Sequence, residues 1–206
     1  MPTTAVILAG GIGRRMGGMN KAMLSYGDEA FIERQIRVAS LGTDEIIVVS
    51  NDQAISSLLH NRRNVTIIPD VYIGEGPLAG LHAGLSAASY SSVWVLGCDQ
   101  PFLDVAAALY LQDRMESGSY QAALPIFGGR PQPLHALYRK ETMQPVQALL
   151  ELGERKILSL LDHIPWCGID ESEFKEQGIP LNFVDDVDTP EQYAEARLLF
   201  DDSDNS

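Results

Sequence analysis

Three short runs of apolar residues constrain the fold of this chain more than any other feature. They cover residues 5–8, 45–50 and 92–96, and in each run the apolar residues are consecutive rather than alternating. This pattern is typical of strands that are covered on both faces, as in a parallel sheet. Residues 65–68 and 121–125 are two further candidates for strands. The sequence therefore predicts a central sheet that is buried on both sides.

Segments with the helical spacing of apolar residues lie between these strands. We expect helices over residues 31–41, 78–88 and 103–115. Strands that alternate with helices form right-handed βαβ units. The chain is therefore predicted to adopt an α/β fold, a Rossmann-like three-layer sandwich with a mostly parallel central sheet. Ligands in such folds bind at the carboxyl ends of the strands, so residues that follow the strands are candidates for a functional site.

The length and the later segments suggest the domain organisation. A chain of 206 residues fits one domain, which we expect to span residues 1–200. Residues 201–206 are acidic and polar, and we expect them to form a mobile tail. Residues 151–162 predict a charged amphipathic helix with Leu158 and Leu161 on its inner side.

The composition restricts the classes of partner. The formal net charge is −13, so nucleic acid and anionic membrane surfaces should repel the chain at long range. A small triphosphate responds instead to a few local arginines, lysines and backbone amides. No apolar stretch approaches the roughly 18 residues that a membrane span needs, and Cys98 and Cys167 form no CxxC pair. We expect a cytoplasmic protein that binds neither nucleic acid nor membranes.

A glycine-rich loop directly follows the first predicted strand. Five glycines fall within residues 10–18, and Arg14, Arg15 and Lys21 lie in or just after this segment. Glycines let the backbone approach a ligand closely, and successive N–H groups can form an anion site. The alternative is a glycine-rich turn with exposed arginines. Because charge and glycines coincide at the end of a buried strand, we interpret the loop as a phosphate-binding site.

Two common nucleotide motifs do not match this loop. A dinucleotide-binding fingerprint that begins at Gly11 needs glycine at position 16, which is Met16. A Walker A loop needs lysine directly after its last glycine and then Ser or Thr, whereas Lys21 is three residues beyond Gly18 and precedes Ala22. The sequence supports neither a dinucleotide reductase nor a P-loop enzyme.

Asp99 is the candidate metal ligand, because it follows the predicted strand at residues 92–96. Magnesium is usually bound by one or two carboxylates together with water and substrate phosphates. An aspartate before Pro101 is also common in turns, which is the alternative for Asp99. Asp70, which follows Pro69, has the same alternative explanation, namely a structural residue of a turn.

Five segments in order resemble the molybdenum cofactor guanylyltransferase family of nucleotidyltransferases. The loop contributes Leu-Ala-Gly-Gly, then Arg-Met-Gly and a lysine, and the third segment contributes Cys-Asp-x-Pro-Phe. Five ordered segments are far more specific than any one of them. The matching segments are residues 8–21, residues 69–70 with 76–80, and residues 98–103, 129–138 and 186–191.

The resemblance implies transfer of GMP from GTP to the phosphate of molybdopterin, with release of pyrophosphate and Mg²⁺ as the cofactor. Arg15 and Lys21 would hold the triphosphate and act in catalysis with Asp99, which would hold the metal. The nucleotide contacts that it implies are Leu8, Ala9, Gly10, Gly11, Lys21, Asn51, Asp70 and Asp99.

The chain departs from the family pattern at three positions. Asn20 stands where the family often has aspartate, and Asp186 and Asp188 stand where asparagines are expected. Two carboxylates where amides are expected could add a metal ligand or alter the acceptor side, so the identity of the acceptor stays open. The alternatives are cytidylyl or other nucleotidyl transfer, to molybdopterin or to a sugar or polyol phosphate, and a nucleotide-binding module without catalysis. Because molybdopterin is large and oxygen-sensitive, we also expect transient protein partners that deliver the cofactor.

Overall fold

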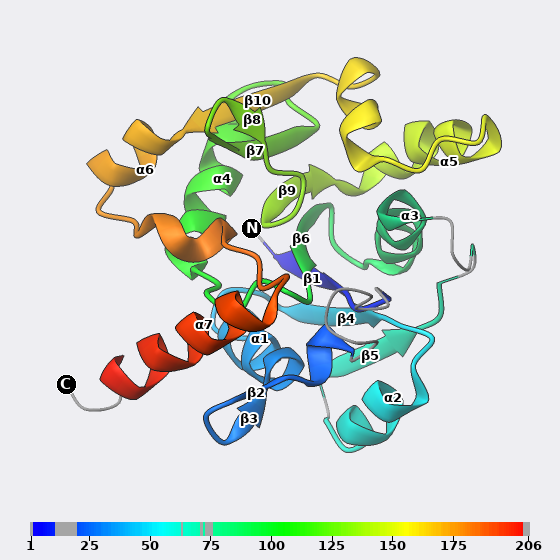
Figure 1. Cartoon of the computed structure of the whole chain (residues 1–206). Helices are drawn as coiled ribbons and strands as arrows, with labels where there is room; N and C mark the ends of the chain where they lie inside the picture. The colour runs from blue at the N-terminus through cyan, green and yellow to red at the C-terminus, as the bar shows by residue number, and fades with distance from the viewer. Residues whose placement is uncertain (1, 11–19, 63, 71, 73–75, 204–206) are drawn as a thin grey trace.

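The structure is a computed structural model that describes residues 2–10, 20–62, 64–70, 72 and 76–203. In this part of the chain, eight strands form one sheet and two more form a small hairpin, with helices packed around the sheet (Figure 1). The hairpin strands are β2 (Ser25–Tyr26) and β3 (Glu29–Ala30). The sheet strands are β1 (Thr3–Leu8), β4 (Glu45–Val49), β5 (Val65–Ile68), β6 (Ser92–Gly97), β7 (Ala122–Phe127), β8 (Arg130–Pro131), β9 (Ala136–Arg139) and β10 (Trp166–Asp170).

Helices connect most of these strands. None of the helices within the described ranges has the length and apolar character that crossing a membrane requires. The α-helices are α1 (Phe31–Ala39), α2 (Gln53–Leu59), α3 (Pro77–Ala87), α4 (Val105–Ser117), α5 (Met143–Glu151), α6 (Glu171–Glu176) and α7 (Pro190–Ser203). The 3₁₀ helices are η2 (Lys21–Met23), η3 (Lys140–Thr142), η4 (Ile157–Asp162) and η5 (Leu181–Val184).

The strand order is β10-β7-β9-β6-β1-β4-β5, with β8 paired to β7. Strand β1 lies between β4 and β6 and is parallel to both, and β5 is parallel to β4. Strand β9 is antiparallel to its neighbours β6 and β7. The prediction of a mostly parallel central sheet is therefore confirmed.

Helices cover both faces of the sheet, because successive residues of a strand point to opposite sides. Along β1, Ala5 and Ile7 belong to a core cluster with α1, α2 and α4, whereas Val6 belongs to a cluster with α3 and α5. Figure 1 shows α3 and α5 on one side of the sheet and α1 and α4 on the other. The three-layer α/β prediction is confirmed, and the consecutive apolar runs reflect strands that are buried on both faces.

The expected helices and strands appear with shifts of up to two residues at most ends, but one expected helix is wrong. Helix α5 ends at Glu151, and Gly153 has a φ of 85°, which turns the chain out of the helix. The following turn is the 3₁₀ helix η4, which buries Ile157 and Leu160, while Leu158 is 45% exposed. Leu161 packs against the core as expected, whereas Leu158 does not lie on the inner side.

Helix α3 approaches β1 closely because it carries glycine where the two elements cross. A Cβ at Gly84 would overlap Val6 Cγ1 and would lie 3.1 Å from Val6 Cγ2. A Cβ at Gly80 would lie 3.3 Å from Leu8 Cδ2. Close packing at these glycines places the start of α3 beside the carboxyl end of β1.

The contact at Gly84 yields a stability prediction. Gly84→Ala should lower the free energy of unfolding by about 1–3 kcal/mol, because the added methyl group overpacks a fully buried strand. Alanine has a more favourable helix propensity than glycine by about 1 kcal/mol. If the clash with Val6 relaxes easily, the free energy of unfolding would therefore stay unchanged or increase. Urea unfolding measures the difference. Ser86→Ala, on the exposed side of the same helix, is the control, with an expected change within about 0.5 kcal/mol.

Candidate active site

The carboxyl ends of β6, β1, β4 and β5 lie side by side, and the predicted site residues follow these ends. Backbone hydrogen bonds extend beyond the strands: the Ala9 N–H donates to the Val49 carbonyl at 2.9 Å, and the Cys98 N–H donates to the Leu8 carbonyl at 3.2 Å. The Ser50 N–H donates to the Ile68 carbonyl at 3.0 Å. The segments that follow the four strands are thus fixed relative to one another at one edge of the sheet.

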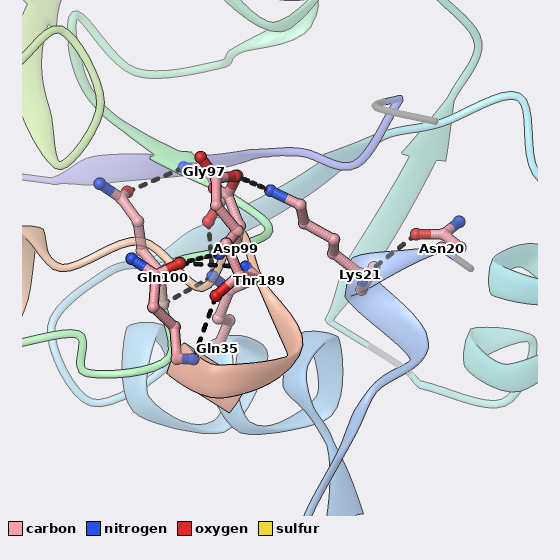
Figure 2. Close-up of polar contacts among 10 residues, drawn as sticks. Asn20, Lys21, Gln35, Gly97, Asp99, Gln100 and Thr189 are labelled. Atoms are coloured by element: carbon pink, nitrogen blue, oxygen red, sulfur yellow. Dashed lines mark hydrogen bonds and ion pairs between the residues drawn. The ribbon is translucent and has the colours of Figure 1, made fainter. Parts of the chain in front are cut away.

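Lys21 forms the central polar contact at this edge. Its Nζ donates to Asp99 Oδ2 at 3.0 Å and also to Asp188 Oδ1 (Figure 2). The Lys21 side chain is only 13% exposed. Burial opposes the charge of the ammonium, but the contacts with Asp188 and Asp99 outweigh it and raise the pKa of Lys21 above 10.5. The lysine is therefore a permanent cation between two carboxylates.

Asp186 adds a third carboxylate. Loss of hydration, followed by repulsion from Asp99 and Asp188, raises its pKa from 3.8 to about 7, against the opposing effects of Lys21 and a hydrogen bond with Gln100. The residue as a whole is nevertheless exposed, so water reaches this group from outside. We call Asp99, Asp186, Asp188 and Lys21 the carboxylate cluster.

The start of α7 fixes Asp188 in this cluster. The Gln192 side-chain oxygen accepts from the N–H groups of Asp188 and Thr189 at 2.8 and 3.0 Å, and the Gln192 N–H donates to Thr189 Oγ1 at 3.2 Å. This reciprocal arrangement is a capping box, followed by Pro190 at the first helical position. The Asp-x-Asp-Thr-Pro-Glu sequence thus positions Asp188 by forming a helix N-terminus.

The loop that carries Asp99 is held by hydrogen bonds from three segments. Gln35 Nε2, on α1, donates to the Gly97 carbonyl at 2.6 Å and to the Gln100 carbonyl at 2.9 Å. Within the loop, the Gly97 N–H donates to Gln100 Oε1 at 3.1 Å. From the C-terminal segment, the Val187 N–H donates to the Asp99 carbonyl at 2.8 Å. Figure 2 shows Gln35 and Lys21 approaching this loop from different elements.

Glycine is required at the end of β6. A Cβ at Gly97 would lie 2.7 Å from Asp99 Oδ1 and 2.9 Å from Leu134 Cδ1. A larger residue would push the carboxylate out of its place beside Lys21.

The neighbours of Asn20 explain why asparagine stands at a position where the family often has aspartate. Asn20 Nδ2 donates to Asp52 Oδ2 at 2.6 Å, while Asn20 Oδ1 accepts from the Ala22 N–H at 3.0 Å. Asp52 in turn caps α2 by accepting from the Ala54 N–H at 2.8 Å. An aspartate at position 20 would face the Asp52 carboxylate, so an amide fits this chain.

Asn51 and Asp70 form a second group beside the cluster. Asn51 Nδ2 donates to the Asp70 carbonyl at 3.3 Å, and Asp70 Oδ1 accepts from the Tyr72 N–H at 3.0 Å. Burial raises the pKa of Asp70 and lowers that of His82 on α3, whose ring packs edge-on against Tyr72. A groove of about 640 Å³ between α2 and β5 reaches Asn51.

The remaining predicted residues lie partly within and partly outside the described part of the chain. Ala9 is buried, Leu8 is half-buried, and Gly10 is exposed, with no atom of the described residues within 4 Å of the position of a Cβ. Gly11 and Arg15 lie outside the described residues, so their roles stay predictions.

His135 and Cys98 lie in the core. His135 is fully buried, accepts from the Asp104 N–H at 3.2 Å, and has its pKa lowered to about 3 by burial. Cys98 is buried, and burial raises its thiol pKa to about 12, so it is no nucleophile.

The described residues contain no group of three His, Cys, Asp or Glu side chains arranged to hold a metal ion. Magnesium needs fewer protein ligands, because it retains water and binds substrate phosphates. Asp99 and Asp188 already share one cation, the Lys21 ammonium. Carboxylate oxygens that converge on a positive charge fit this hard, oxygen-binding ion.

The sequence of this chain is similar to those of known proteins. Residues 5–165 match the model of the MobA-like NTP transferase domain. A protein from Pelotomaculum thermopropionicum named probable molybdenum cofactor guanylyltransferase is 32% identical over 98% of this chain and 96% of its own. A protein of the same name from Clostridium perfringens is 32% identical over 84% of each chain.

Solved structures are also similar. Molybdopterin-guanine dinucleotide biosynthesis protein A from Archaeoglobus fulgidus has a TM-score of 0.83 and 25% identity, and the match covers 97% of this chain and 99% of that one. The 2-C-methyl-D-erythritol 4-phosphate cytidylyltransferase from Thermus thermophilus has a TM-score of 0.73 at 16% identity, with 98% and 100% covered. The second likeness shows the fold alone.

The raised pKa of Asp186 predicts a pH dependence. Between pH 4 and 7 the folded chain binds a proton at Asp186 that the unfolded chain has lost, so this carboxyl makes stability fall as pH rises through that window. Asp186→Asn removes this contribution. In urea unfolding from pH 5 to 8, its stability relative to wild type should therefore increase with pH.

Asp113→Asn, at an exposed position on α4, is the control for this comparison, and its stability relative to wild type should not vary with pH in the same way. A constant difference between Asp186→Asn and wild type from pH 5 to 8 would contradict the raised pKa.

Proposed function

The chain belongs to the MobA-like NTP transferase family of nucleotidyltransferases, and we propose that it transfers GMP from GTP to the phosphate of molybdopterin, releasing pyrophosphate. The ion pair between Lys21 and Asp99 carries this proposal. It joins the end of the glycine-rich loop to the residue that follows β6, at the edge where α/β folds bind ligands. The names of the relatives support guanylyl transfer to the molybdenum cofactor.

The reaction is an attack by the acceptor phosphate on the α-phosphate of GTP, in line with the departing pyrophosphate. Charge accumulates on the phosphate oxygens and the leaving group, so positioning and electrostatic stabilisation provide most of the catalysis. Lys21 supplies a permanent positive charge at the edge of the sheet where the triphosphate would bind. Arg15 adds a guanidinium that can bind phosphate oxygens bidentately.

Asp99 would hold Mg²⁺, with Asp188 as the second carboxylate. The metal would neutralise charge on the phosphate oxygens when bound. Lys21 separates from one or both carboxylates to reach the triphosphate, and the start of α7 keeps Asp188 in place meanwhile. This assignment gives a role to the aspartate that replaces the expected asparagine at position 188.

The nucleoside would lie along the ends of β1, β4 and β5. The backbone of Leu8, Ala9, Gly10 and Gly11 would contact it, while Asn51 and Asp70 would offer side chains. A carboxylate such as that of Asp70 accepts from the amino group of guanine. Cytosine also carries an amino group, so Asp70 alone does not select guanine, and cytidylyl transfer is the alternative that the experiment below separates.

We also propose a cytoplasmic location, one domain spanning residues 1–200, and transient partners that deliver molybdopterin. The net charge of −13 supports the absence of nucleic acid among its partners.

Pyrophosphate release in an anaerobic mixture of protein, Mg²⁺, molybdopterin and a single nucleotide tests the proposal. We expect release with GTP and little with CTP, UTP or ATP. Asp99→Asn and Lys21→Met should each lower kcat/KM by about 100-fold or more, because each removes a charge that acts on the triphosphate. Asp113→Asn, an exposed aspartate on α4, is the matched control and should retain full activity.

The outcomes separate the alternatives. Release with CTP alone would indicate that the protein transfers a cytidylyl group, and the assignment of the site residues would stand. Nucleotide binding without turnover would favour a non-catalytic module. Full activity of Asp99→Asn would remove the basis of the proposed site.

A further inference from the structure

We propose that Gln35 is a positioning residue for Asp99: through its side-chain amide it fixes the loop that presents the Asp99 carboxylate to the metal. The inference rests on the proposed function, because it assumes that Asp99 holds a divalent cation. Gln35 belongs to α1, outside all five segments that resemble the family.

Gln35 is an unusual residue for its place in the helix. It lies on the inner face of α1 with Phe31, Ile32, Ile36 and Ala39, and it is fully buried. A buried amide costs free energy unless its hydrogen bonds are made. An apolar side chain would fill this position without that cost, so the amide is explained by the bonds that it forms.

Both of the bonds that Gln35 donates go to the Asp99 loop. Its Nε2 lies 2.6 Å from the Gly97 carbonyl oxygen and 2.9 Å from the Gln100 carbonyl oxygen. Its Oε1, in contrast, has no hydrogen-bond partner among the described residues. The amide is therefore oriented entirely by its two contacts with the loop.

The two carbonyls bracket Cys98 and Asp99, so one planar NH₂ group sets the spacing across this short turn (Figure 2). Gln100 reinforces the turn, because its Oε1 accepts from the Gly97 N–H at 3.1 Å. The Asp99 carbonyl accepts from the Val187 N–H at 2.8 Å. If the loop moves, Asp99 changes its position relative to both Lys21 and Asp188.

A purely structural amide is the competing explanation, and Gln112 on α4 provides the matched control. Gln112 is also a buried glutamine within a helix, and it bonds Glu116 and Thr3 instead of the Asp99 loop. Replacing either glutamine by methionine removes the amide at similar volume. Both variants should lose stability, but only the change at Gln35 should weaken metal binding.

Electron paramagnetic resonance of Mn²⁺, titrated into the full chain with saturating GTP, measures this difference. We expect Gln35→Met to bind Mn²⁺ about tenfold more weakly than wild type, in the range typical of groups that orient a metal ligand. Gln112→Met should bind within about twofold of wild type. Thermal unfolding of each variant without metal gives the structural cost separately.

Equal Mn²⁺ affinity in Gln35→Met and wild type would overturn the inference and leave the proposed function standing. Equal weakening in both glutamine variants would also overturn it, since it would indicate a general structural effect. Wild type that binds no Mn²⁺ with GTP would overturn both proposals. If Gln35→Met does not fold, Gln35→Asn replaces it: its amide is one methylene too short to reach both carbonyls, and the same weakening is expected.

Discussion

The ammonium of Lys21, held between Asp99 and Asp188, is the interaction on which the candidate site depends. It joins three segments that are far apart in the sequence: the end of the glycine-rich loop, the residue after β6, and the start of α7. Partly exposed ion pairs contribute only about 1 kcal/mol or less to stability. The contact therefore matters chiefly because it places charges. Three carboxylates around one lysine leave the described cluster net negative, which suits a divalent cation.

The sheet makes this contact possible. Four neighbouring strands are parallel, so the segments after β6, β1, β4 and β5 emerge at one edge. Glycine permits close packing at two places, at Gly84 between α3 and β1 and at Gly97 beside the Asp99 carboxylate. The same edge carries Asn51 and Asp70, so a nucleotide could extend from the cluster along the ends of β1, β4 and β5.

Much of this arrangement was predictable from the sequence. Consecutive apolar runs indicated strands that are buried on both faces. Because ligands bind at the carboxyl ends of strands, Asp99 was predicted to lie at the same site as the glycine-rich loop. The position of Asp188 was not predictable, because its place depends on the neighbouring helix cap: Thr189 and Gln192 cap α7, and the Asp188 side chain accepts from Lys21. The helix expected at residues 151–162 was wrong because Gly153 adopts a positive φ that the apolar spacing does not reveal.

Gln35 is marked in the sequence by its polarity. It is a polar residue at the spacing of the apolar face of α1, and a buried amide in such a position requires partners elsewhere in the fold. Those partners are backbone carbonyls, which no sequence motif marks. Arg15 and Gly11 lie outside the described residues, so their part in the site stays a prediction.

The most direct test of the central claim is a crystal structure of the protein with GTP and Mn²⁺, with the metal located by its anomalous scattering. We expect an anomalous peak at coordination distance from the Asp99 carboxylate and from a phosphate oxygen of GTP, with Lys21 in contact with the triphosphate. A metal–nucleotide complex bound away from Asp99 and Lys21 would contradict it.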